Sequence, residues 1–251
     1  TEQKVRVRLI DCVGFLVKDA AGNMEDGKER MVRTPWSEKA IPFHEAARIG
    51  TQKVIEEHST IGLVITSDGS FGELPRENFT EAEEKTIQEL KKQHKPFLVL
   101  VNSQMPYKEA AQKAVSEIQE KYQVTALSVN CDQLHKEDIA QILEKILYEF
   151  PVSQIQFFIP KWVEMLPADH ELKKQLLEQI REKTKHLFQI RDITKEAIQL
   201  SGPYVKDSLL EDTGLSDGTV KVRVRIQDKY YYQMLSQMSG TQMESEYELI
   251  H

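Results

Sequence analysis

The sequence contains few cysteines and no long apolar run, and these absences exclude several classes of protein. Its two cysteines, Cys12 and Cys131, form no Cys-x-x-Cys pair and show no Cys/His spacing that suits zinc. The best apolar run, residues 97–101, is far shorter than the ~20 residues of a membrane-spanning helix. Residues 1–8 are polar and charged, unlike a signal peptide. We therefore expect a cytosolic protein.

Basic residues do not outnumber acidic residues either. The chain has 33 Lys and Arg against 40 Asp and Glu, a net charge of -7, whereas a nucleic-acid-binding surface usually shows as a basic patch. A local basic group, Lys221, Arg223 and Arg225, precedes three tyrosines at 230–232, a combination that RNA-stacking proteins also use. The acidic total charge favours core or interface packing for the tyrosines instead. We predict no nucleic-acid partner.

Strand-like and helix-like segments alternate over the first 150 residues. The predicted strands are 5–10, 61–65, 97–101 and 124–129, and the predicted helices are 43–58, 81–94, 108–121 and 137–148. A loop of about 25 residues follows the first strand. Continuous apolar runs as strands, alternating with helices, indicate a parallel sheet covered on both faces.

The pattern changes after Pro151. Residues 155–159 and 220–226 are predicted strands, 172–200 is dominated by helix formers, and the chain ends in a predicted helix at 241–251. We therefore divide the chain into domains at 1–150 and 151–251. The second is a smaller α/β region that we expect to be incomplete at its C-terminus.

The strongest local motif is Asp11-Cys12-Val13-Gly14, directly after the first predicted strand. Ligands of open parallel sheets bind outside the carboxyl ends of the strands. An aspartate there can hold Mg²⁺ through water, and a glycine three residues later lets a backbone amide approach a terminal phosphate. Asp-x-x-Gly alone is common in turns, so the motif indicates a phosphate site only in combination with the ends of the other predicted strands.

The other predicted strands also end in polar residues: Thr66-Ser67-Asp68-Gly69, Val101-Asn102-Ser103 and Ser128-Val129-Asn130. This order of strand ends resembles the Era-like GTPases. The resemblance implies a partial Ras-like P-loop NTPase sheet over 1–150. It also implies that Asn102 and Ser128 contact the nucleotide and that Asp11 and Gly14 serve the phosphates.

Three departures from that family bear on activity. The guanine-selecting Lys-x-Asp is replaced by Ser103, Gln104 and Met105, and a methionine accepts no hydrogen bonds from guanine. Phe15 occupies the position where Ras-like enzymes place a water-orienting glutamine. No Gly-x-x-x-x-Gly-Lys-[Ser/Thr] occurs in the sequence, so the phosphate-binding loop is missing. We expect the 251-residue chain by itself to have no measurable ATPase activity.

Five stretches, 8–14, 34–36, 41–47, 57–62 and 148–151, resemble a narrower family, the spore coat morphogenetic ATPases, within the TRAFAC/Era-like P-loop NTPases. The resemblance implies a cytosolic ATPase that polymerises on the forespore surface as the base layer of the spore coat. The resemblance also implies that Asp11 is the Walker B acid, which holds Mg²⁺ through water, and that ATP is the substrate. The implied partners are copies of itself, other spore coat proteins and a membrane-surface anchor protein. The family's P-loop would lie before Thr1, and its anchor-binding region would lie beyond His251.

Two alternatives stay open at this point: a GTP-dependent ribosome-assembly factor of the Era type, and a structural module without catalysis. Two structural expectations also follow. Strands 5–10 and 61–65 should either pair directly or accept a third strand between them, because unpaired strand edges are costly. The acids Glu81, Glu83 and Glu84 should form a solvated first turn that complements the helix dipole.

Overall fold

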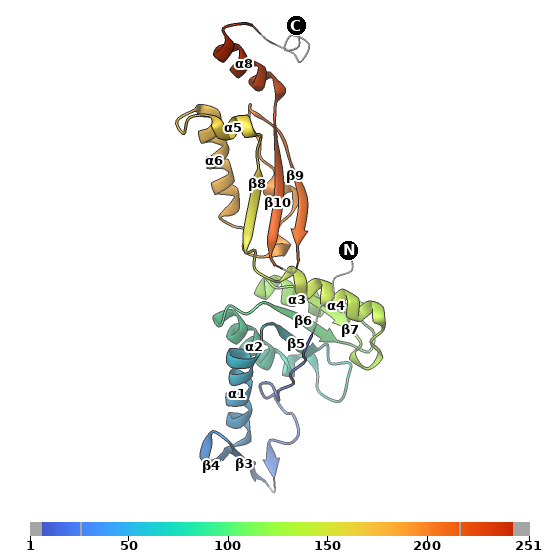
Figure 1. Cartoon of the computed structure of the whole chain (residues 1–251). Helices are drawn as coiled ribbons and strands as arrows, with labels where there is room; N and C mark the ends of the chain where they lie inside the picture. The colour runs from blue at the N-terminus through green and yellow to red at the C-terminus, as the bar shows by residue number, and fades with distance from the viewer. Residues whose placement is uncertain (1–6, 26, 216, 243–251) are drawn as a thin grey trace. The chain divides into compact units, whose positions relative to one another are not determined.

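The computed structural model describes residues 7–25, 27–215 and 217–242 (Figure 1). The chain forms two compact units, Thr1–Ile146 and Leu147–His251, and each is described by itself. Within the described residues, no helix is both long and apolar enough to cross a membrane.

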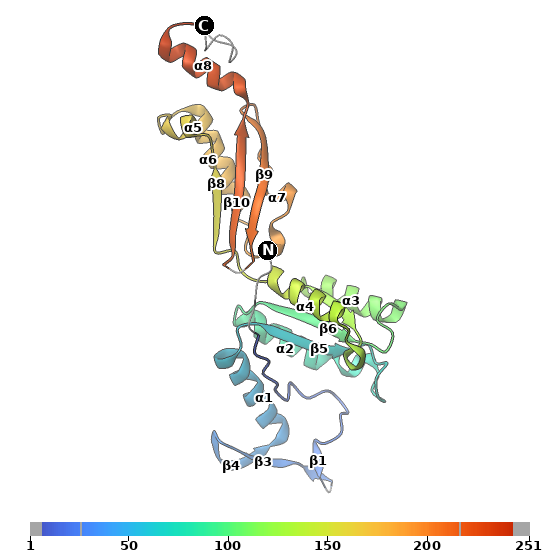
Figure 2. The same ribbon diagram turned by 45° about the vertical axis from the view of Figure 1, so that its right-hand side comes forward.

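The first unit contains a three-stranded parallel sheet in the order β5-β6-β7 (Figure 1), of which Figure 2 labels β5 and β6. The strands are β5 (Gly62–Ser67), β6 (Phe97–Asn102) and β7 (Ala126–Val129). The helices that follow them are α2 (Thr80–Lys92), α3 (Glu109–Tyr122) and α4 (Lys136–Tyr148). Residues 97–101 are all buried, as a continuous apolar run in a central strand requires. The predicted mixed α/β fold with a parallel sheet flanked by helices is confirmed.

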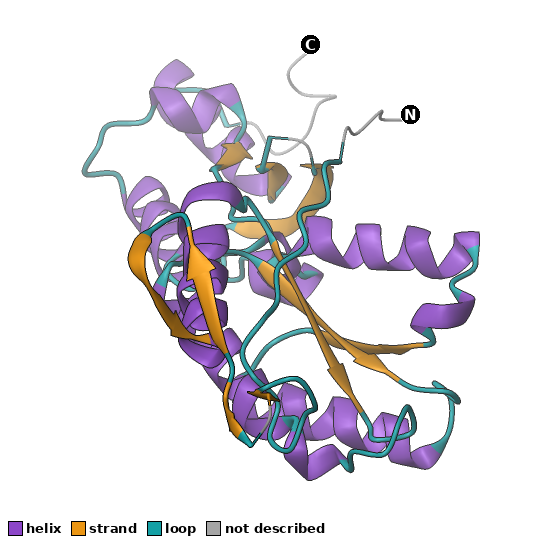
Figure 3. Cartoon of the chain, turned by 90° about the horizontal axis from the view of Figure 1, so that it is seen from below, coloured by secondary structure: helices purple, strands orange, loops and turns teal. Residues whose placement is uncertain are grey.

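Both faces of this sheet carry helices, as Figure 3 shows. On one face, Val99 and Val101 pack with Ile87 of α2 and Ile118 of α3. On the other face, Leu98 and Leu100 pack with Ile142 of α4. Among the described residues, this second layer covers β6 and β7 but not β5. Leu63 is 39% exposed and Ile65 is 60% exposed, although both lie beside buried leucines of β6.

The expectation about the first predicted strand was wrong. Residues 7–10 have no regular secondary structure, and Val5 and Arg6 lie outside the described residues. In the described part of the chain, β5 pairs only with β6, so neither direct closure nor a third strand fills its outer edge. The period-two alternation of 5–10 is a short signal, and the described part of the segment, residues 7–10, forms no pairing with the open edge of β5.

The predicted long loop contains two small hairpins. They are β1 (Met24–Glu25) with β2 (Lys28–Glu29), and β3 (Met31–Thr34) with β4 (Ser37–Pro42). The helix α1 (Phe43–Lys53) follows and ends in a π-helical turn, Val54–His58. Strands of two to six residues give too short a pattern to stand out from a loop.

The second unit has a mixed sheet in the order β8-β10-β9. Its strands are β8 (Gln154–Phe158), β9 (Val205–Gly214) and β10 (Thr219–Ile226), and its helices are α5 (Lys161–Met165), α6 (Glu171–Thr184), α7 (Lys195–Ile198) and α8 (Asp228–Ser239). β8 runs parallel to β10, whereas β9 runs antiparallel to it. β9 was not predicted from the sequence, and the helix predicted at 241–251 lies outside the described residues from 243 onward.

The basic residues of β10 form ion pairs within the sheet. Lys221 pairs with Asp212 at 3.4 Å, and Arg223 and Arg225 pair with acids of β9. The valines between them are buried in the core of this unit. Tyr230 packs edge-on against Tyr204 at 4.8 Å between ring centroids, so this ring contributes to packing.

Candidate functional site

The candidate site lies at the carboxyl ends of β5, β6 and β7. Strand pairing sets Ser67 beside Asn102 and Asn102 beside Val129, so the polar ends of all three strands meet at one edge. This is the edge at which open parallel sheets bind ligands.

Asn102 connects two of these strand ends. Its Oδ1 accepts a hydrogen bond from the backbone N–H of Cys131 at 2.9 Å. The bond joins the end of β6 to the turn that follows β7. It also fixes the orientation of the Asn102 carboxamide, which a nucleotide-contacting residue requires.

Ser128 holds the loop that follows β6. Its hydroxyl donates to the carbonyl of Pro106 at 2.8 Å and accepts from Nε2 of Gln112 at 2.9 Å. Gln112 also donates to the same carbonyl at 2.7 Å. The three groups close a ring of hydrogen bonds, so Ser128 supports the loop at 103–108 in this structure.

Asp68 and Ser70 join the loops after β5 and β6. The backbone N–H and the hydroxyl of Ser70 donate to Oδ1 of Asp68 at 2.9 and 2.5 Å. The backbone N–H of Gln104 donates to the Ser70 hydroxyl at 2.9 Å. Burial raises the pKa of Asp68, but hydrogen bonds from Ser103 and Ser70 outweigh it and hold the pKa below its usual value.

Gly69 permits a tight return of the chain toward Arg76. Its φ is +84°, and an added Cβ would lie 2.7 Å from the Arg76 backbone nitrogen, so no other residue fits without a shift. The Arg76 guanidinium donates to both carboxylate oxygens of Glu83, at 2.6 and 3.0 Å, and to Oγ1 of Thr66 at 3.1 Å.

Glu83 corrects the interpretation of the acidic helix start. Its side chain is only 2% exposed, whereas a solvated first turn was expected. The reason is Arg76, which supplies a charged partner from the preceding turn, so the carboxylate can be buried. Glu84 is ion-paired with Lys121 at 2.7 Å, and Glu81 with Lys85 at 2.7 Å.

Asp11 and Gly14 lie in a segment without regular secondary structure. Asp11 is exposed, and Gly14 has a φ of +79° with open space around it. No hydrogen bond among the described residues links either of them to Asn102 or Ser128. The structure therefore brings together two of the four predicted site residues.

The described residues contain no group of three or more His, Cys, Asp or Glu that could hold a metal ion. A single exposed carboxylate, Asp11, fits a Mg²⁺ ion that nucleotide phosphates and water mostly hold. It does not fit a site made by protein ligands alone.

Asp68 was identified from the sequence as part of a polar strand end but was given no role, and Ser70, Arg76 and Gln112 were not predicted at this edge. The Asp68-Gly69-Ser70 turn is the one signal that could have indicated Ser70, because Asp and Gly favour turns after a strand.

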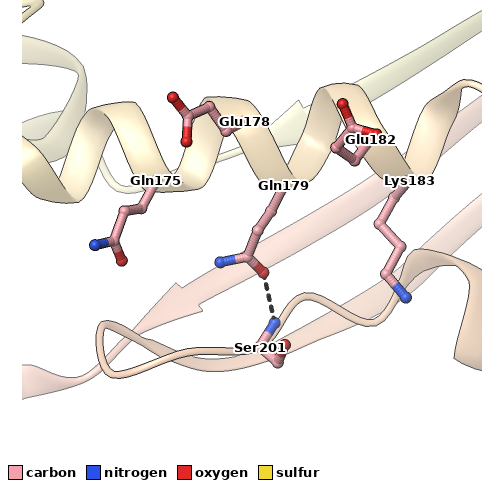
Figure 4. Close-up of a pocket in the computed structure, with 6 residues that line it drawn as sticks. All are labelled: Gln175, Glu178, Gln179, Glu182, Lys183 and Ser201. Atoms are coloured by element: carbon pink, nitrogen blue, oxygen red, sulfur yellow. Dashed lines mark hydrogen bonds between the residues drawn. The ribbon is translucent and has the colours of Figure 1, made fainter.

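A separate hollow lies in the second unit, between α6 and the loop after α7 (Figure 4). It is lined by Gln175, Glu178, Gln179, Glu182, Lys183 and Ser201. Oε1 of Gln179 accepts from the Ser201 backbone N–H at 2.9 Å, which ties the loop to the helix. Its lining residues are of polar types, and the bond between Gln179 and Ser201 is the one side-chain hydrogen bond among these six described residues, so no acid or base is paired with the serine there and the hollow is not the candidate site.

The parallel sheet, its flanking helices and its polar strand ends define a partial P-loop-like α/β domain. The family model described as "Stage IV sporulation protein A, ATPase domain" matches residues 1–151, and the model of the middle domain of the same protein matches 152–251. The chain belongs to the stage IV sporulation protein A family.

Three curated proteins named "Stage IV sporulation protein A" support this membership. The protein of Bacillus subtilis (strain 168) is 37% identical over 95% of this chain, and that of Bacillus anthracis is 36% identical over 98%. The protein of Clostridioides difficile (strain 630) is 39% identical over 98% of this chain. The matches cover 49%, 50% and 50% of these relatives, so the chain spans about half their length. No solved structure matches the chain significantly.

Proposed function

We propose that the whole protein is an ATPase that uses ATP hydrolysis to drive its self-assembly into the base layer of the bacterial spore coat. The observation that carries the proposal is the ATPase-domain match over 1–151, which includes the Asp11–Gly14 motif and all three strands of the parallel sheet. The relatives' own name supports a role in sporulation.

Asp11 is the proposed acid that serves the nucleotide's Mg²⁺ through water. The ion, when bound, would neutralise charge that develops on the transferred phosphoryl group. The exposed carboxylate of Asp11 would orient a coordinating water, and Gly14 would let a backbone amide approach the terminal phosphate.

The test is Asp11→Ala in the full-length protein. Because metal-based charge stabilisation is worth several kcal/mol, turnover should fall by about two orders of magnitude or more, measured by phosphate release. Thermal unfolding should not change, because Asp11 is exposed. Glu120→Ala, an exposed acid on α3, is the matched control. Parental turnover in Asp11→Ala would contradict the assignment.

ATP is the proposed substrate because the residue at the guanine-selecting position is Met105. Its side chain is 52% exposed, and its backbone N–H donates to the Ser103 hydroxyl at 3.1 Å. A thioether accepts hydrogen bonds only weakly, so the acceptor pair for guanine is missing. Competition binding should show a preference for ATP over GTP, whereas a GTP preference would favour the Era-type ribosome-assembly factor.

The proposed partners are copies of the same protein, other spore coat proteins and a membrane-surface anchor protein, with the assembly located at the forespore surface. The proposal of these partners rests on the resemblance of the five stretches between 8 and 151 to the spore coat morphogenetic ATPases. Sedimentation of the full-length protein with and without ATP tests the self-assembly, which should require the nucleotide. Equal sedimentation under both conditions would contradict it.

A further inference from the structure

Asn78 joins two segments that lie 60 residues apart in the sequence. Its side-chain nitrogen donates to the carbonyl of Lys18 at 3.0 Å and to Oδ2 of Asp19 at 3.0 Å. The Lys18 backbone N–H donates in return to the carbonyl of Asn78 at 3.3 Å. We call these three hydrogen bonds the Asn78 clasp.

One end of the clasp holds the chain just beyond the Asp11–Gly14 motif. Lys18 and Asp19 lie in a turn closed by a hydrogen bond from the Ala20 N–H to the Val17 carbonyl at 3.2 Å. Asp19 has a φ of +59°, a left-handed conformation that Asp and Asn tolerate better than other non-glycine residues. The motif ends only four residues before Lys18, so a short length of chain connects the motif to the clasp.

The other end of the clasp is anchored in the core. Asn78 ends the short 3-10 turn Arg76–Asn78, and Arg76 is bonded to Glu83 of α2 and to Thr66 of β5. Asn78 therefore fixes the exposed segment to the carboxyl end of the sheet, where the candidate site lies. The charge of Lys18 also helps to lower the pKa of Glu81, after the larger effects of Lys85, which places Lys18 near the start of α2.

We propose that Asn78 is a positioning residue for the reaction, and this rests on the ATPase function proposed above. The clasp ties the chain four residues beyond Gly14 to the loop that follows β5, which limits how far Asp11 and Gly14 can move from a nucleotide bound at the edge formed by β5, β6 and β7. A group that acts on the phosphates must be placed to within a fraction of an ångström, and a displacement of about 1 Å costs roughly two orders of magnitude in rate. Opening the clasp should lower kcat by about one to two orders of magnitude with a smaller effect on KM.

The test exchanges the two side chains of the clasp in the full-length protein. Asn78→Asp removes both side-chain donors and sets a carboxylate against that of Asp19, so it breaks the two side-chain bonds of the clasp and leaves only the backbone bond from Lys18. Asp19→Asn alone keeps an oxygen that accepts from Asn78 and should have little effect. The double variant lets the new amide at 19 donate to the new carboxylate at 78, which restores one of the two side-chain bonds but not the bond to the Lys18 carbonyl, so it should recover part of the lost kcat. Glu77→Gln, at an exposed neighbouring position, is the control.

Hydrogen exchange gives a readout that needs no turnover. In the 251-residue chain, Asn78→Asp should speed exchange of the amides at 15–20, and adding Asp19→Asn should slow it again. Unchanged exchange in Asn78→Asp would overturn the clasp itself. Faster exchange together with parental kcat would overturn the positioning role alone. Absence of turnover in the parental protein would overturn the proposed function and the positioning role with it, while the exchange result would still decide the clasp.

Discussion

The ion pair between Arg76 and Glu83 should be the most sensitive single contact of the first unit. The two side chains are 17% and 2% exposed, and Nη1 of Arg76 lies 2.6 Å from Oε2 of Glu83. Arg76→Met would remove the charge partner of a buried carboxylate. It would also remove the donor to Oγ1 of Thr66.

The expected loss of stability comes from the Glu83 carboxylate, which would stay buried without a charged partner. Removing one member of a buried ion pair leaves an uncompensated charge and costs about 3–5 kcal/mol. For a chain of this size, each kcal/mol corresponds to roughly 2–4 °C in Tm. Arg76→Met should therefore lower the Tm of the first unit by roughly 6–20 °C.

Thermal and urea denaturation of the 251-residue chain measure this loss, with two comparisons. Lys85→Met breaks the exposed pair with Glu81, whose side chains are 57% and 68% exposed, and should cost less than about 0.5 kcal/mol. The double variant Arg76→Met/Glu83→Leu leaves no unpaired charge, so it should be more stable than Arg76→Met alone. Equal stability of Arg76→Met and Lys85→Met would contradict the assigned role of the buried ion pair, and so would a double variant no more stable than Arg76→Met.

Three further outcomes follow from the same structure. Gly69→Ala should destabilise the chain by about 1–3 kcal/mol, because it forces a left-handed backbone and a clash, whereas Gly50→Ala, in a helix with room for a methyl group, should stabilise it by about 0.5–1 kcal/mol. Urea denaturation measures both. The folded-state pKa of Asp68 lies below its ordinary value of 3.8, so its ionised form stabilises the fold above that pH and the contribution is lost as pH falls below it. Asp68→Asn should therefore be less stable than the parental chain at pH 7, and denaturation at decreasing pH should show the difference shrinking below 3.8. Val64→Lys should destabilise the chain far more than Ile65→Lys, because Val64 is 6% exposed and Ile65 is 60% exposed; equal Tm values would contradict this.

Much of the fold was predictable because its elements carry strong periodic patterns. The helix predicted at 137–148 is observed as Lys136–Tyr148, and the run at 97–101 forms the central strand. β9 was missed because a register shift opposite Lys221 and Val222 breaks its alternation, and Leu209 and Leu210 stand side by side in its sequence. A bulge that interrupts the period of two removes the alternation of apolar and polar residues by which a strand is predicted.

The candidate site was predictable only at its strand ends. The positions of Asn102 and Ser128 follow from strand boundaries alone, since parallel strands end at a common edge. The pairing of Arg76 with Glu83 could not be predicted, because an acid in the first turn of a helix ordinarily faces solvent. Its burial depends on the path of the loop between them, and that path depends on the positive φ of Gly69.

The sequence of β5 is typical of a strand that is covered on both faces and paired on both edges. In the described structure it is covered on one face and paired on one edge. Leu63, Val64 and Ile65 are consecutive apolar residues, a pattern typical of a strand buried on both faces and paired on both edges. Val64 is buried under α2, but Leu63 and Ile65 face outward, where no described helix covers them. The outer backbone edge of β5 also has no partner strand among the described residues. An edge strand normally carries charge, proline or a bulge to prevent pairing, and residues 63–65 have none of these. This edge is therefore the part of the first unit whose side chains and backbone groups are both suited to accept a further strand.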